Sequence, residues 1–201
     1  MSRIKGHPDY DDLIHRLTPV VGQHQTAGKR TVYRCVDLNQ WARPENLITG
    51  EGAKIHGSRW MAKDITAVVY AASTDNIALK EAKHNFQRFG IKPLKNKPRL
   101  IVEINVSFQN VVALKTLLEN LKSPTIDELL DEDWGEVNAQ GDEALSQAFG
   151  RAFWNLGVEG FTVPSAQDRR GTNLILFPTN QKSGSRLEIS GEHELQNWIK
   201  H

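Results

Sequence analysis

The sequence has one cysteine, two methionines, few aromatic residues and almost no net charge. A single cysteine, Cys35, cannot form an internal disulfide, which fits a reducing compartment. The formal net charge of +1 gives no bulk electrostatic attraction to nucleic acid or to anionic membranes. No apolar run approaches the length of a membrane span, and the first residues lack the apolar core of a signal peptide. We therefore expect a cytoplasmic protein that binds neither nucleic acid directly nor a membrane.

The sequence also lacks the spacings that mark familiar metal and catalytic sites. Its seven histidines are scattered, so no metal site is expected. No phosphate-binding loop and no dinucleotide fingerprint is present. Ser165 follows an expected strand, but Val163 and Gln167 occupy the positions where a nucleophile elbow needs glycine, which disfavours a triad hydrolase.

The chain of 201 residues is long enough to bury a substantial core. We treat residues 1–30 as an N-terminal extension, turn-like from Gly22 to Arg30, and residues 31–201 as the domain. Strands are expected at 31–36, 68–73, 99–108, 160–164, 172–177 and 186–189. Helices are expected near 11–19, 75–90, 125–130, 142–157 and 195–199, with a loop at 38–51 and a helix or loop at 111–120. Because strands and helices do not alternate strictly, the order favours an α+β fold.

Side chains at helix ends are also predicted from local patterns. Thr125 and Glu128 have the spacing of a capping box. Asp142 is expected to cap the helix that ends at Gly157, and the acidic run 131–133 reads as a solvated corner.

Three successive segments carry a cation, an aromatic ring and a carboxylate. A glycine-rich loop from Gly50 delivers Arg59 and Trp60, an apolar strand carries Tyr70, and the next helix carries Glu81. Arg34 adds a second guanidinium, a group that binds phosphate oxygens in a bidentate way. Glu81 has the chemistry to stabilise positive charge at a breaking glycosidic bond. The set suits a substrate with phosphates, a flat ring and such a bond.

Each of these residues also has a purely structural interpretation. The arginines fit salt bridges or exposed strand positions, and Tyr70 fits a core tyrosine with a satisfied hydroxyl. Glu81 fits a surface helix position beside Lys80 and Lys83. Residue type and spacing leave these alternatives open.

In combination, the motifs resemble the RES-domain family, named for an arginine, a glutamate and a serine. The matching segments are V-Y-R around Arg34, G-S-R-W around Arg59, V-V-Y-A-A-S around Tyr70, A-L-K-E-A around Glu81, A-F-G-R-A-F-W in the late helix, and F-T-V-P-S-A with N-L-I-L-F-P around Ser165 and Asn173. The resemblance covers roughly residues 31–180. Ser58 and Met61 depart from the glycine and asparagine that are more usual in the family, and the segments 38–52 and 120–140 look longer than in a minimal member.

The resemblance implies an ADP-ribosyltransferase-like mixed β core and a toxin that consumes NAD as its substrate. By position, Arg34 and Arg59 would hold the NAD diphosphate, Tyr70 would flank the nicotinamide, Glu81 would serve the ribose and the breaking bond, and Ser165 would line the nicotinamide end. The implied partner is an antitoxin with a helix-turn-helix DNA-binding part that plugs the active site, with a toxin dimer as one arrangement of the complex.

The expected reaction is cleavage of the nicotinamide–ribose bond, which depletes NAD by hydrolysis or phosphorolysis. One alternative is a protein ADP-ribosyltransferase. Another is a non-catalytic protein-binding module anchored by Trp41, Trp60 and Trp134. An RNA-cleaving toxin would need a basic groove and acid–base histidines, which the near-neutral charge and the scattered histidines do not favour.

Overall fold

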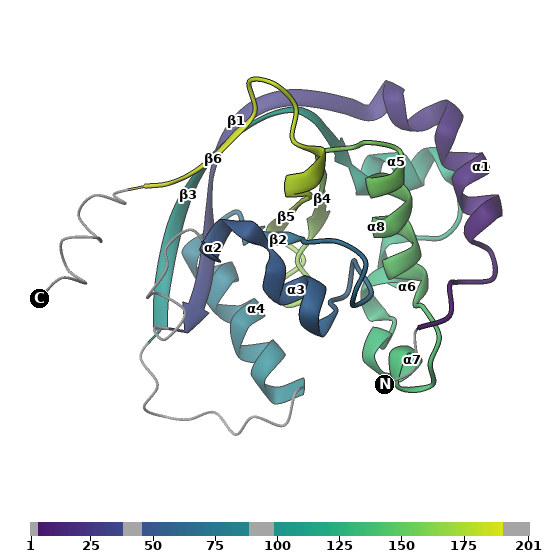
Figure 1. Ribbon diagram of the computed structural model, residues 1–201, viewed down its shortest axis with the longest axis horizontal. Helices are drawn as coiled ribbons and strands as arrows, with labels where there is room; N and C mark the ends of the chain where they lie inside the picture. Colours follow the sequence, from purple (N-terminus) through teal and green to yellow (C-terminus); the bar gives the residue numbers. More distant parts are fainter. Residues whose placement is uncertain (1–3, 38–45, 89–98, 191–201) are drawn as a thin grey trace, which may run out of the picture.

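The computed structural model describes residues 4–37, 46–88 and 99–190 (Figure 1). Its helices are α1 (Tyr10–Val21), η1 (Gly22–His24), α2 (Asn46–Thr49), α3 (Glu51–His56), α4 (Asp75–Arg88), α5 (Leu114–Leu121), α6 (Ile126–Asp131), α7 (Trp134–Ala139), α8 (Leu145–Asn155) and η3 (Pro178–Asn180). Its strands are β1 (Gln25–Asp37), β2 (Val69–Ala72), β3 (Arg99–Ala113), β4 (Gly160–Pro164), β5 (Thr172–Leu176) and β6 (Arg186–Ile189). The predicted α+β class is confirmed.

Five of the strands pair into a ring. The order is β1-β2-β5-β4-β3, and β1 pairs again with β3, while β6 lies on β3. The long β1–β3 pair is antiparallel from Gln25↔Val112 to Asp37↔Arg99. The β3–β4 pair is parallel, and the other pairs are antiparallel. The result is a barrel-like core, with β1 and β3 curving along one side of it (Figure 1).

Apolar side chains are buried on both faces of the short strands β2, β5 and β4. On one face, Tyr70 and Ile175 join a core with residues of α1, α5 and α8. Its aromatic centre is Phe161, whose ring centroid lies 5.2 Å from that of Trp60 and 5.1 Å from that of Phe153. On the other face, Val69 joins a second core built mainly from β1 and β3. Burial on both faces is why these strands read as continuous apolar runs.

The N-terminal extension is not peripheral in the structure. Leu13, Leu17 and Val21 of α1 are buried in the same core as α8. Residues 25–30, which the sequence indicated as turn-like, form the first half of β1 and pair with β3. The turn prediction is therefore wrong from Gln25 onward, although the division of the chain at residue 31 stays a prediction.

Several other helices and strands begin or end at residues that differ from the predicted ones. The expected loop at 38–51 contains α2 and the start of α3, and its first part lies outside the described residues. The strand expected to end at Phe108 continues to Ala113, so the helix-or-loop segment 111–120 is strand before α5 begins. The helix expected at 195–199 and the predicted helix end at Gly90 lie outside the described residues.

The acidic run at the end of α6 is solvent-exposed at Asp131 and Asp133, as predicted for a solvated corner, but Glu132 between them caps another helix. The Glu132 carboxylate accepts hydrogen bonds from the backbone N–H groups of Leu145 and Ser146, both at 2.9 Å, and from the Ser146 hydroxyl at 2.8 Å. Asp133 caps α7. The N-cap position of α8 is Ala144, so the predicted Asp142 cap is wrong and Glu132 supplies the carboxylate.

The predicted capping box of α6 is confirmed. The Thr125 hydroxyl accepts from the Glu128 N–H at 3.3 Å, and the Glu128 carboxylate accepts from the Thr125 N–H at 2.6 Å. Hydrogen bonds from Thr125 lower the pKa of Glu128. The cap fixes where α6 starts, and α6 in turn contacts one of the predicted site arginines.

Candidate active site

Glu81, Ser165 and Asn173 meet through one carboxylate oxygen. The Ser165 hydroxyl donates to Glu81 Oε1 at 2.5 Å, and the Asn173 amide donates to the same oxygen at 2.7 Å. Glu81 comes from α4, Ser165 directly follows β4, and Asn173 lies in β5. The two donors fix the carboxylate at the edge of the sheet.

The packing of α4 explains why Glu81 arrives at this place. Ile77 and Ala78, one turn earlier in α4, are buried against Tyr33 and Cys35 of β1. That contact lays the helix across the end of β2, so the next turn presents Glu81 to the ends of β4 and β5. Glu81 is thus directed to Ser165.

The loop after Ser165 is held against α4. Ser165 is fully buried, and its hydroxyl oxygen also accepts from the N–H groups of Gln167 and Asp168, at 3.1 and 3.2 Å. A Cβ on Gly171 would lie 1.9 Å from Ile77 Cδ1, so any larger residue there would displace the Ile77 side chain. These contacts give the Ser165 hydroxyl one orientation, toward Glu81.

A charged cluster ties the same loop to the neighbour of Glu81. Lys80 Nζ lies 2.7 Å from Asp168 Oδ2, and Arg170 donates to both Asp168 oxygens at 3.1 and 3.2 Å. Hydrogen bonds from Arg170 and Lys80 hold the pKa of Asp168 well below its usual range. The loop between β4 and β5 is therefore joined to α4 at Ser165 and again at Asp168.

Tyr70 shares the sheet face that carries Asn173. Tyr70 pairs with Ile175 and Ala72 pairs with Asn173, and residues two apart on a strand point to the same face. The Tyr70 hydroxyl lies 2.5 Å from the Ser58 hydroxyl and accepts from the Trp60 N–H at 3.1 Å. Burial raises the pKa of Tyr70, outweighing the opposite effect of these bonds and of Arg59, while Glu81 raises it further. Tyr70 therefore stays protonated at any physiological pH.

Arg59 is held by the C-terminal end of α6. Its Nη1 donates to the carbonyl oxygens of Leu129 at 3.1 Å and Glu132 at 2.9 Å. The adjacent Trp60 is buried, and a Cβ on Gly150 would lie 1.7 Å from the Trp60 carbonyl oxygen, so α8 sits directly on this turn. The turn is thus fixed by two helices, and the charge of Arg59 acts on Tyr70.

Arg34 approaches from the other face of β1. The strand alternation puts it beside Val32 and Val36, whereas Tyr33 faces α4. Its Nη1 donates to the Leu47 carbonyl at 3.0 Å. Burial lowers the pKa of Arg34, and the nearby Tyr70 oxygen raises it. Arg34 therefore lies on the face of β1 opposite to Tyr33 and is held there by a carbonyl oxygen of α2.

Contacts among the described residues join Glu81 to Ser165 directly, while the other predicted residues are held by different elements. Glu81 and Ser165 are hydrogen-bonded, and Tyr70 shares the sheet face of Asn173, whereas Arg59 is bonded to carbonyl oxygens of α6 and Arg34 to the Leu47 carbonyl. Sequence reasoning assigned no role to Asn173 or Ser58, both of which contact this set. A polar residue in the apolar strand T-N-L-I-L-F was a signal for Asn173, whereas nothing local marked Ser58.

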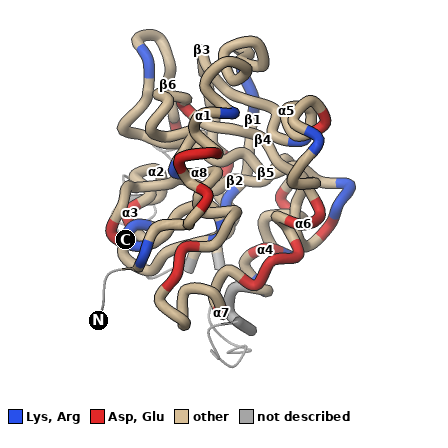
Figure 2. The backbone as a smooth tube through the Cα atoms, turned by 90° about the vertical axis from the view of Figure 1, so that its right-hand side faces the viewer, with Lys and Arg blue, Asp and Glu red and all other residues tan. Residues whose placement is uncertain are grey.

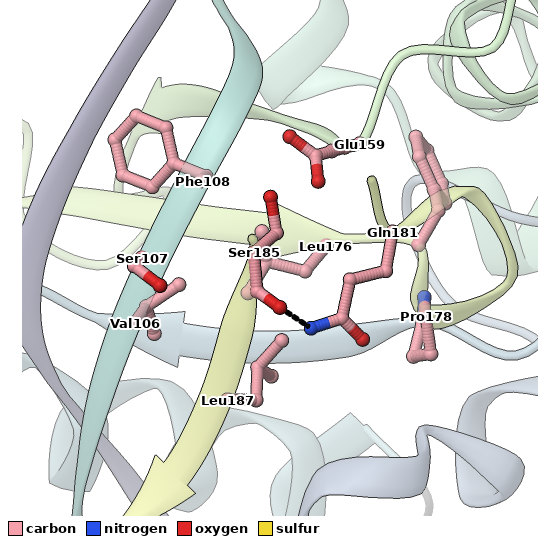
Figure 3. Close-up of a pocket in the computed structure, with 10 residues that line it drawn as sticks. Val106, Ser107, Phe108, Glu159, Leu176, Pro178, Gln181, Ser185 and Leu187 are labelled. Atoms are coloured by element: carbon pink, nitrogen blue, oxygen red, sulfur yellow. Dashed lines mark hydrogen bonds between the residues drawn. The ribbon is translucent and has the colours of Figure 1, made fainter. Parts of the chain in front are cut away.

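Two hollows lie elsewhere. One is a cavity of about 10 Å³ beside β3, β5 and β6, with the buried Glu159 on its wall (Figure 3). Burial raises the pKa of Glu159, but hydrogen bonds from the backbone N–H groups of Lys182, Gln109 and Asn110 lower it below its usual value. Glu159 is therefore a structural anchor. The other hollow is an open groove of about 740 Å³ over β1, β3 and β6.

Surface features bear on the alternative functions. Trp60 and Trp134 are buried, at 2% and 7% exposure, so neither can anchor a surface partner, and Trp41 lies outside the described residues.

Figure 2 shows basic and acidic residues interspersed on the side facing the viewer. Within the described ranges, no three His, Cys, Asp or Glu side chains are grouped as metal ligands. In the same part of the chain, no helix has the length and apolar character that crossing a membrane requires.

Comparison with known proteins gives a family and a fold. The RES domain family matches residues 31–198. A chain in the crystal structure of the M. tuberculosis MbcT–MbcA toxin–antitoxin complex is similar with a TM-score of 0.65 at 20% sequence identity, over 90% of this chain and 96% of that chain. No protein of curated function matches the sequence.

Proposed function

Because the chain belongs to the RES-domain family, we propose that it is the toxin of a toxin–antitoxin pair and cleaves the nicotinamide–ribose bond of NAD. The observation that carries the proposal is the Glu81 carboxylate, held by Ser165 and Asn173 on the face that bears Tyr70. The family match agrees with the predicted resemblance, and the similar chain comes from a toxin–antitoxin complex. An ADP-ribosyltransferase-like arrangement of the core is part of the proposal.

In the proposed mechanism, Glu81 stabilises the cationic character that develops at the anomeric carbon as nicotinamide leaves. The donors Ser165 and Asn173 restrain the carboxylate before substrate arrives, so little reorganisation is needed at the reacting centre. Tyr70 offers its ring to the departing nicotinamide. Arg34 and Arg59 supply positive charge for the diphosphate, and their bonds to carbonyl oxygens hold the side chains in place.

The acceptor distinguishes the remaining reaction types. Water gives NAD hydrolysis, phosphate gives phosphorolysis, and a protein side chain gives ADP-ribosylation of a target. We propose depletion of NAD in the cytoplasm as the toxic effect. The proposed partner is an antitoxin that carries a helix-turn-helix part and occludes the site of Glu81, with a toxin dimer in the complex.

The test is nicotinamide release from NAD by the purified protein, with and without phosphate. Glu81→Gln preserves size and is expected to lower the rate at least about 100-fold, because it removes the negative charge at the reacting carbon. Arg34→Ala and Arg59→Ala are expected to raise KM strongly. Glu51→Gln, at an exposed position of α3, is the matched control and is expected to be fully active.

Circular dichroism and thermal unfolding of Glu81→Gln check that the fold is retained. Wild-type protein that releases no nicotinamide under either condition overturns the proposed function. A Glu81→Gln variant with normal turnover overturns the role of Glu81 even if the wild type is active.

A further inference from the structure

Ser58 stands where the resemblance led us to expect glycine, and its hydroxyl is built into the Tyr70 site. Ser58 Oγ lies 2.5 Å from the Tyr70 hydroxyl and 3.2 Å from the Met61 carbonyl oxygen. The Ser58 N–H also donates to that carbonyl at 2.9 Å. Ser58 therefore closes a short turn around Arg59 and Trp60 and connects it to β2.

The direction of each hydrogen bond can be deduced by counting protons. The Trp60 N–H can only donate, so the Tyr70 oxygen accepts from it. The Met61 carbonyl can only accept, so the Ser58 hydroxyl donates to it. The Tyr70 proton then has Ser58 Oγ as its acceptor, and all three bonds are satisfied at once. In this arrangement the Tyr70 hydroxyl donates its hydrogen bond to Ser58 and has no proton left to donate to a ligand.

The turn that carries Ser58 is itself rigid. The fully buried Gln147 of α8 donates to the Ser58 carbonyl oxygen at 2.8 Å, and its own carbonyl oxygen accepts from the Ala144 N–H at 3.1 Å. The approach of Gly150 to the Trp60 carbonyl leaves no room for the turn to move toward α8. A rigid acceptor for the Tyr70 proton fixes the tilt of the Tyr70 ring.

We infer that Ser58 is a positioning residue for substrate: its Oγ accepts a hydrogen bond from the Tyr70 hydroxyl, so that Tyr70 presents a fixed ring face to the flat heterocycle of the ligand and does not use its hydroxyl on it. This rests on the proposed function for the identity of the ligand as NAD. A ring platform of this kind contacts the nicotinamide both before and during bond cleavage. Its contribution is therefore to binding, and loss of Ser58 raises KM while kcat is retained.

The experiment is a double-mutant cycle with Ser58→Ala and Tyr70→Phe, measured by nicotinamide release. Ser58→Ala is expected to raise KM roughly five- to tenfold with kcat within about twofold of wild type. Tyr70→Phe keeps the ring and removes the proton that Ser58 accepts, so adding Ser58→Ala to it is expected to change KM no further. Ser58→Thr, which retains the hydroxyl, is expected to restore a near-normal KM.

Several results would overturn the inference. They are an unchanged KM in Ser58→Ala, a fall in kcat at constant KM, or effects of the two substitutions that multiply in the double variant. If Ser58→Ala does not fold, the comparison of Ser58→Thr with Ser58→Cys decides, because sulfur is a weaker acceptor. A KM in Ser58→Cys equal to that in Ser58→Thr contradicts the role of the hydroxyl.

A second readout separates this inference from the proposed function. The chain has three tyrosines, so the Tyr70 hydroxyl can be assigned by comparing wild type with Tyr70→Phe in NMR spectra of 13Cζ-labelled tyrosine. A Tyr70 hydroxyl proton protected from exchange in wild type and unprotected in Ser58→Ala supports the inference even if NAD is not the substrate. Equal exchange in both proteins overturns it. Absence of nicotinamide release in wild type bears on the proposed function alone.

Discussion

Asn173 joins the Glu81 carboxylate to β5 through a single hydrogen bond of 2.7 Å. A hydrogen bond to a charged group contributes about 1.5–3 kcal/mol, so its loss in Asn173→Ala is expected to lower kcat roughly ten- to a hundredfold. The measurement is steady-state nicotinamide release. Thr172→Ala, at the next position on the opposite face of β5, is the control and is expected to keep kcat within about twofold.

Asn173→Asp is a stricter version of the same test. It puts a second carboxylate beside Glu81, where two like charges repel, so its activity is expected to fall below that of Asn173→Ala. If the aspartate variant is the more active of the two, the amide does not act through its bond to the Glu81 carboxylate. The Asn173 Oδ1 atom finds no hydrogen-bond partner among the described residues, so the bond to Glu81 is the contact that this amide contributes.

At the scale of elements, the loop between β4 and β5 is joined to α4 by the pairing of Asp168 with Lys80, and Arg170 of the same loop also pairs with Asp168. Because these groups depress the pKa of Asp168, its contribution to stability is complete above the ordinary aspartate pKa of 3.8 and is lost as the pH falls below it. We expect Asp168→Asn to lower the urea midpoint at pH 7, and the difference from wild type to shrink between pH 4 and pH 2.

The control for that titration is Asp12→Asn, which removes an exposed pair with Arg16 at 3.8 Å. Isolated surface pairs contribute little, so its urea midpoint should match that of wild type at every pH. A deficit of Asp168→Asn that stays constant down to pH 2 would show that the charge of Asp168 is not what holds the loop.

Glu132 connects two other elements. Its carboxylate caps the N-terminus of α8, and its carbonyl accepts from Arg59. Glu132→Ala leaves two N–H groups of α8 without partners and is expected to lower the free energy of unfolding by about 1–3 kcal/mol. Denaturant unfolding measures it. Glu119→Gln, exposed on α5, should be neutral, and an unchanged stability in Glu132→Ala would contradict the capping role.

At the scale of the whole molecule, the elements that the sequence predicted correctly are those with a local pattern. The stretch of β3 from Leu100 to Phe108 alternates, and α6 carries its own capping box. The features that could not be predicted depend on partners far along the chain. Glu132 caps a helix that begins thirteen residues later, and the first half of β1 becomes strand only because β3 pairs with it. A polar stretch such as residues 25–30 has no apolar periodicity to reveal such pairing.

In the candidate site, too, the local motifs were predictable from the sequence and the long-range contacts were not. The motifs located Arg34, Arg59, Tyr70, Glu81 and Ser165 in the chain, because each stands in a short recognisable segment. Their mutual geometry depends on strand register, which puts Asn173 beside Glu81 and turns Arg34 to the other face of β1. Since register is set by long-range pairing, no window of the sequence contains it.

The N-terminal extension supplies the last prediction, because its helix α1 completes the core that positions the site. Leu13, Leu17 and Val21 are buried in the cluster that also contains Trp60 and Phe149. Deleting residues 1–24 uncovers apolar surface of α8 and α5, and we expect the shortened chain to unfold at a markedly lower temperature or to aggregate. In the full chain, Leu17→Ala should cost about 2–5 kcal/mol, since a fully buried leucine leaves a cavity.

If α1 is part of the folding unit, the deletion of residues 1–24 and Leu17→Ala must both lower stability. If α1 were an accessory segment, residues 25–201 would unfold cooperatively at the temperature of the full chain, and Leu17→Ala would be neutral. Leu17→Met keeps most of the buried volume and is expected to cost less than about 1.5 kcal/mol, which separates loss of packing from any effect of altering the helix itself. A deletion variant with full stability would restrict the folding unit to the residues from the start of β1 onward.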